Sequence, residues 1–68
     1  MKKSIVCTLK SGKKNFMIDE LQCFVAEWGM EIEEDTNRNT TIYATQDELD
    51  GLLENEKWIR ENFDVVRK

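Results

Sequence analysis

The segment from Thr40 to Ile59 predicts a strand that runs directly into a helix. Its first residues alternate between two faces, which is the two-residue period of a half-buried strand. Thr45 and Glu48 then have the spacing of a capping box, in which each side chain bonds the other residue's backbone amide. An apolar stripe at helical spacing follows, formed by Leu49, Leu52, Leu53 and Ile59. A chain built around this segment has to pack a helix against a sheet.

The remaining sequence predicts three more strands and one more helix. Strand patterns cover Ser4–Lys10, Met30–Asp35 and Phe63–Arg67, in addition to the strand from Thr40 to Thr45. The polar connection DTNRNT joins the two middle strands into a β-hairpin. The helix that begins at Gln46 extends to about Asn62 and contains one glycine, Gly51, which we expect to mark a close approach to the sheet.

The other helix pattern lies between Asn15 and Gly29, with Asn15 as a candidate N-cap and Gly29 as a candidate C′ residue. An alternative start is Asp19, whose own capping box would be completed by Gln22. Residues 15–18 would then be a short strand. The core-facing stripe consists of Met17, Leu21, Phe24, Val25 and Trp28, and Phe16 and Cys23 project away from it.

This order, βαββαβ, predicts an α+β fold: a ferredoxin-like sandwich in which a four-stranded antiparallel sheet carries two helices on one face. The expected spatial strand order is 4-1-3-2. Both tryptophans, Trp28 and Trp58, are expected to cover the ends of the core. The helix-covered face of the sheet is expected to hold Ile5, Cys7, Leu9, Met30, Ile32, Ile42, Ala44, Phe63 and Val65.

Length and composition exclude several classes of protein. The 68 residues make a single domain, 1–68, with a thin core. No apolar run approaches the roughly 20 residues of a membrane span, and Ser4–Leu9 is too short and polar for a signal-peptide core. We therefore expect a cytoplasmic protein that does not contact membranes. The chain has no histidine, no phosphate-binding glycine loop and only two cysteines, so we expect no enzyme, no cofactor and no metal site.

The two cysteines are expected to stay unbridged. Cys7 alternates with the apolar residues of the first strand and is expected in the core, whereas Cys23 lies on the outer side of the first helix. A disulfide needs Cα atoms within about 7 Å and converging Cβ vectors.

Charge is distributed in blocks along the chain, with a formal net charge of −4. The first 14 residues carry five lysines and no acid, whereas residues 15–35 carry seven acids and no base. Such blocks are typical either of ordinary solvated faces or of an electrostatically polarised molecule.

The sheet face without helices is the candidate partner site. It is expected to present Tyr43 among small residues, beside an edge strand with acidic outward side chains. We therefore expect a small acidic module that binds and regulates or inhibits a partner protein, with a basic protein that handles nucleic acid as one candidate. A homodimer would also cover this face. The candidate partner-binding residues are Val6, Thr8, Glu31, Glu33, Thr41 and Tyr43.

Weak binding of RNA or DNA is the alternative function. The N-terminal lysines would contact phosphates, and the open face would stack bases on Tyr43. That face carries a single aromatic residue, and Glu31 and Glu33 would repel phosphate, so nucleic acid is the less favoured partner.

Several of these segments resemble the propeptide-type inhibitors of subtilisin-like proteases. The similar stretches are SIVCTLKSG, IYATQDELDGLL and FDVV, which span most of the chain. The resemblance implies a ferredoxin-like domain and a protease as one class of target. The chain departs from the family at Thr41-Ile42-Tyr43, where the family has a glycine-containing strand, and only Arg67 and Lys68 follow Val66. The resemblance therefore bears on the fold more than on protease inhibition.

Overall fold

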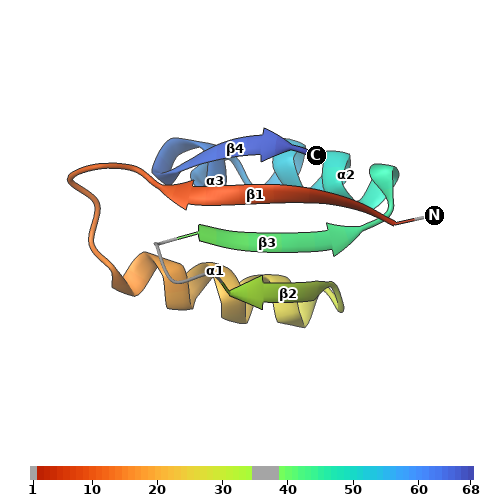
Figure 1. Cartoon of the computed structure of the whole chain (residues 1–68), viewed down its shortest axis with the longest axis horizontal. Coiled ribbons are helices and arrows are strands. Elements are labelled where there is room, and N and C mark those ends of the chain that lie inside the picture. The colour runs from red at the N-terminus through yellow and green to blue at the C-terminus, as the bar shows by residue number, and fades with distance from the viewer. Residues whose placement is uncertain (1, 35–38) are drawn as a thin grey trace.

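The computed structural model describes residues 2–34 and 39–68, which form one four-stranded antiparallel sheet and three helices. All three helices lie behind the sheet in the view of Figure 1, so within the described residues the opposite face has no second layer. The α+β class and the antiparallel sheet predicted from the sequence are confirmed. The elements are β1 (Lys3–Leu9), α1 (Phe16–Glu27), β2 (Glu31–Glu34), β3 (Asn39–Ala44), α2 (Gln46–Asn55), α3 (Lys57–Asn62) and β4 (Phe63–Arg67).

The strands lie in the order β2-β3-β1-β4, which is β4-β1-β3-β2 when read from the other edge. β1 is central and pairs with β3 through Ile5 and Ile42 and with β4 through Cys7 and Val65. β2 and β3 form the predicted hairpin. Asp35 and most of the DTNRNT connection lie outside the described residues.

The core lies between the sheet and the helices, and its composition follows from strand alternation. Seven of the nine residues predicted for the helix-covered face are buried, and the other two, Ile32 and Val65, are half-buried and pack against the core. Thr40, which continues the same alternation, is also fully buried. The helices contribute Leu21, Val25, Leu49, Leu52, Leu53 and Ile59.

α1 begins at Phe16, so the alternative start at Asp19 is wrong. The amides of Met17 and Ile18 donate to the carbonyls of Lys14 and Asn15, which closes a tight turn before the regular helix. Asn15 itself has helical dihedral angles and its side chain makes no capping bond. At the other end Gly29 has φ of 79°, the left-handed conformation expected of a C′ residue.

The prediction of a single helix from Gln46 to about Asn62 is wrong, because the chain breaks at Glu56 into α2 and α3. At about 100° per residue, a continuous helix would place Trp58 opposite Leu49 and so away from the core. The break instead turns Trp58 toward α1, where its ring meets Phe24 edge-on at a centroid distance of 5.6 Å. Packing of this aromatic pair accounts for the change in helix direction.

The expected role of Gly51 is also wrong. A Cβ atom placed on Gly51 would meet no atom within 4 Å apart from its own helix and neighbours, so the sheet does not approach it closely. Its carbonyl instead accepts a hydrogen bond from the Asn55 side chain at 2.9 Å, one turn before the break.

The capping box that starts α2 is present as predicted. The Glu48 amide donates to Thr45 Oγ1 at 3.2 Å, and the Thr45 amide donates to Glu48 Oε1 at 3.0 Å. The bond from the Thr45 amide, followed by a bond of 2.9 Å from the Thr45 hydroxyl to Glu48 Oε1, lowers the pKa of the Glu48 carboxyl group. The capping box thus fixes the point where β3 ends and α2 begins.

We expect Thr45→Ala to lower the free energy of unfolding by about 1 kcal/mol, because the change removes the cap of α2. Asn15→Ala is the matched control, since Asn15 precedes α1 but makes no side-chain cap. Urea denaturation of both variants measures the difference. Equal losses in the two variants would show that the Thr45 cap has no special role.

Candidate protein-binding face

The six candidate residues come together on the sheet face that the helices leave open. Residues directly opposite each other in an antiparallel pair share a face, so the strand registers define rows across this surface. One row runs Glu33, Thr41, Val6 and Val66. The next runs Glu31, Tyr43 and Ser4, and Thr8 lies in the row on the other side, between Asn39 and Asp64.

Tyr43 and Glu33 form a hydrogen-bonded pair on this face. The Tyr43 hydroxyl donates to Glu33 Oε1 at 3.2 Å. Partial burial of the phenol, the hydrogen bond to Glu33 and the nearby charges of Glu33 and Glu31 all favour the neutral form and raise the pKa of Tyr43. The ring is half-buried, which holds it in place while leaving part of it accessible to a partner.

Glu31 is already engaged by the N-terminus of the chain. Lys2 Nζ lies 2.6 Å from Glu31 Oε1, and both side chains are mostly exposed. Such an exposed pair is screened by salt. Within the described part of the chain, Glu33, which accepts the bond from Tyr43, therefore carries the unpaired acidic charge beside that residue. Lys2, one of the N-terminal lysines, is directed to the Glu31 carboxylate.

The far end of the face is polar. Thr8 Oγ1 donates to Asn39 Oδ1 at 2.6 Å, across the β1–β3 pair. Asn39 was not among the candidate residues, although the alternation of β3 places it with Thr41 and Tyr43. Val66 is 57% exposed beside Val6 and enlarges the apolar part of the face. Thr45, which the strand pattern also placed here, lies beyond β3 as the cap of α2.

We expect the single tyrosine to titrate above its ordinary pKa of 10.0, and Glu33→Gln to lower that pKa because the charge and the accepting carboxylate disappear. The raised pKa means that the neutral Tyr43 side chain stabilises the folded state, and this contribution is fully present below pH 10. It is lost as the pH rises through the pKa of Tyr43 in the folded state. Tyrosinate absorbance near 295 nm measures the titration. Glu54→Gln, on α2, is the charge-matched control and should leave it unchanged.

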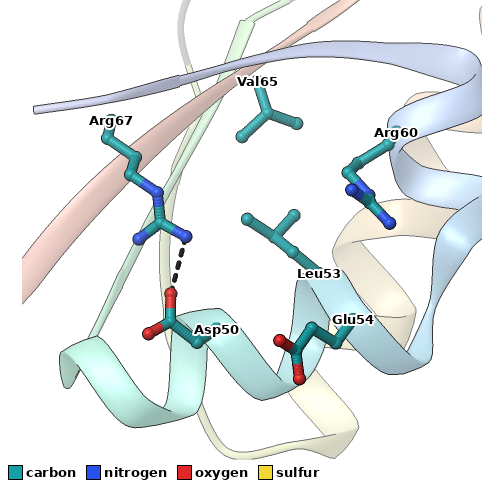
Figure 2. Close-up of a pocket in the computed structure, with 6 residues that line it drawn as sticks. All are labelled: Asp50, Leu53, Glu54, Arg60, Val65 and Arg67. Atoms are coloured by element: carbon teal, nitrogen blue, oxygen red, sulfur yellow. Dashed lines mark hydrogen bonds and ion pairs between the residues drawn. The ribbon is translucent and has the colours of Figure 1, made fainter.

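A hollow of about 360 Å³ lies on the other side of the sheet, between α2, α3 and β4 (Figure 2). Arg67 Nη2 lies 2.6 Å from Asp50 Oδ1, and this bond, followed by one from Gln46, lowers the pKa of Asp50. Arg60 and Glu54 also line the hollow. A carboxylate held ionised in this way is a poor general acid at neutral pH.

The two cysteines lie in different environments. Both cysteines are free, as predicted, with Cys7 buried and Cys23 exposed. Burial raises the pKa of Cys7 to about 12, so its thiol stays protonated and is not a nucleophile. Within residues 2–34 and 39–68 no group of three cysteine, aspartate or glutamate side chains is placed to hold a metal ion.

No helix in the described part of the chain is long and apolar enough to cross a membrane. Comparisons with protein-family models, with curated proteins and with solved structures find no match.

Proposed function

We propose that this chain is a small, non-enzymatic module that binds a partner protein through its open sheet face and thereby regulates or inhibits that partner. The observation that carries the proposal is that, within residues 2–34 and 39–68, no second layer covers the sheet face that presents the half-buried Tyr43. We also propose that the fold is a ferredoxin-like sandwich, which the strand order β4-β1-β3-β2 supports.

The chemistry of the face suits a protein interface. Tyr43 offers a large amphipathic ring whose position is fixed by the bond to Glu33, and tyrosines are frequent anchors of interfaces. Val6 and Val66 lie side by side and give the apolar contact area. Thr8 and Thr41 add short polar side chains that lose little conformational entropy on binding.

The acidic border of this face favours a basic partner. Glu33 lies beside Tyr43, and β2 adds Glu31 on the same face, with both side chains exposed. Such a row of carboxylates presents negative charge as a nucleic-acid backbone does, so a nucleic-acid-handling protein is one class of target. A subtilisin-like protease is another, on the basis of the sequence resemblance alone.

The same arrangement argues against nucleic acid as the ligand. A base stacked on Tyr43 would bring its phosphate close to Glu33, which accepts the tyrosine's hydrogen bond. Lys2, one of the lysines expected to contact phosphate, is paired with Glu31 instead. Repulsion at the centre of the face would oppose the phosphate contacts that supply most nucleic-acid affinity.

We expect Glu33→Gln to weaken capture of the partner more than Glu31→Gln, because Lys2 partly neutralises Glu31. The measurement is capture from nuclease-treated host lysate on the immobilised chain, with quantitative mass spectrometry and then titration of the recovered protein. Stability should change by no more than about 0.5 kcal/mol in either variant. Glu54→Gln carries the same charge change on α2 and should bind as the unaltered chain does.

Two results would contradict the proposal. One is equal capture by the Glu33→Gln variant and the unaltered chain, at both low and high salt, which would leave the acidic border with a role in solubility only. The other is saturable binding of a single-stranded RNA that falls steeply with salt and is lost in Tyr43→Ala, which would select the nucleic-acid alternative.

A further inference from the structure

The two edges of the sheet differ in their capacity to pair with a second copy of the chain. β2 and β4 are the edge strands. β2 exposes Glu31, Glu33 and Glu34, and two such strands placed side by side would repel each other. β4 instead exposes Asp64 and Val66 and is followed by Lys68, a set that contains both charges and an apolar side chain.

The hydrogen-bond phase of β4 shows which of its backbone groups are directed outward. The Lys68 amide donates to the Ser4 carbonyl at 3.0 Å, and the Lys10 amide donates to the Asn62 carbonyl at 2.9 Å. Even-numbered positions therefore direct their groups to β1, and the odd-numbered positions direct theirs to the free edge. The Phe63 amide is engaged by the carbonyl of Ile59. Complete donor–acceptor pairs at the edge thus remain at Val65 and Arg67.

We propose that β4 pairs antiparallel with β4 of a second copy, with the two Val66 residues opposite each other on the dyad. In this register Val65 of each copy bonds Arg67 of the other, which uses the amide and the carbonyl of both residues. Asp64 of each copy then lies opposite Lys68 of the other, on the same face as Val66. The alternative register is shifted by one residue in each copy and places Val65 on the dyad. It would need the Phe63 amide as a donor to the other copy, and that amide is already bonded to Ile59.

The dimer continues the rows of the open face across the dyad. At Val66, one row of the open face meets the same row of the second copy; this row consists of Glu33, Thr41, Val6 and Val66. The Val6 and Val66 side chains of both copies then form one contiguous group of four valines. The dimer thus covers the apolar side chain of Val66, which is 57% exposed in the isolated chain. A five-residue strand contributes only a small interface, so the association is weak and concentration-dependent. This inference does not depend on the proposed function.

Charge reversal tests the register directly. Sedimentation equilibrium from about 10 μM to about 1 mM covers the affinities of weak interfaces. The unaltered chain should dimerise with rising concentration, whereas Asp64→Lys and Lys68→Asp should each weaken self-association by about tenfold or more, because each places two like-charge pairs at the interface. An equimolar mixture of the two variants should restore dimers, since every pair is again of opposite charge. Glu54→Lys is the control for net charge.

A monomeric chain throughout this range would overturn the inference, and so would dimers that both reversals leave intact. Intermolecular nuclear Overhauser effects between Val66 methyl groups of labelled and unlabelled copies test the same register without any substitution. Their absence in a sample that sediments as a dimer would place the interface elsewhere.

Discussion

Phe63→Ala is expected to lower the free energy of unfolding by about 3–5 kcal/mol, the range for removal of a buried phenylalanine ring. Phe63 is 1% exposed and lies at the start of β4, opposite Leu9 of the central strand. A domain of this size has about 0.05–0.15 kcal/mol of stability per residue, so a loss of this magnitude removes much of the total. The variant should be largely unfolded at temperatures that leave the unaltered chain folded.

Phe16→Ala is the matched control for this prediction. Phe16 is 55% exposed at the start of α1, so loss of the same ring there should change stability by no more than about 0.5 kcal/mol. Thermal and urea denaturation, followed by far-UV circular dichroism, measure both variants. Similar losses for the two phenylalanines would mean that β4 does not pack against the helices as described.

Tyr43→Ala is expected to reduce affinity for the protein partner by about 2 kcal/mol, which is about 30-fold in Kd. Tyr43 is the largest side chain among the six candidate residues and lies in the row between Glu31 and Ser4. Its loss removes an aromatic anchor and leaves the Glu33 carboxylate without a donor at that position. Isothermal titration calorimetry with the purified partner measures the change.

The salt response distinguishes the kind of ligand that Tyr43 contacts. If Tyr43 contacts an apolar protein surface, the loss of affinity caused by Tyr43→Ala should be nearly the same at low and high salt, whereas nucleic-acid affinity falls steeply with salt as counterions are reacquired. Tyr43→Ala should also fold as the unaltered chain does, because the ring is only half-buried. Cooperative unfolding caused by this change would show that a second layer covers the face.

Most of the sheet was predictable because the period of two places alternate residues on opposite faces. Ile5 and Cys7 were assigned to the core from this period alone, and β4 was assigned its observed bounds. The start of α2 was predictable for a different reason: the Thr45 capping box is a local signal, complete within four residues.

The break at Glu56 was not predictable from local pattern, because it depends on contact between Trp58 and Phe24 from another helix. Only the assembled fold shows that a continuous helix would direct Trp58 away from α1. Asn15 makes no side-chain cap, because the backbone turns one residue earlier and takes the helical conformation there. At the break, tertiary packing prevails over local preference.

The residues of the candidate face were predictable as a set, but their interactions were not. Alternation put Tyr43 and Glu33 on one face, whereas the bond between them depends on the register of β2 against β3. Likewise, the block of N-terminal lysines indicated a basic patch, and the fold directs Lys2 to Glu31. Strand alternation puts Val66 on the open face with Val6, whereas its exposed fraction follows from its place on an edge strand.

The most direct test of the central claim, that the open sheet face binds a protein, is a resonance map of the isotope-labelled chain with and without the captured partner. We predict that signals of Val6, Thr41 and Tyr43 shift or broaden on addition of the partner, while those of Phe16 and Cys23 on the outer side of α1 do not change. Changes confined to α1, with the sheet-face signals unaltered at saturation, would contradict the claim.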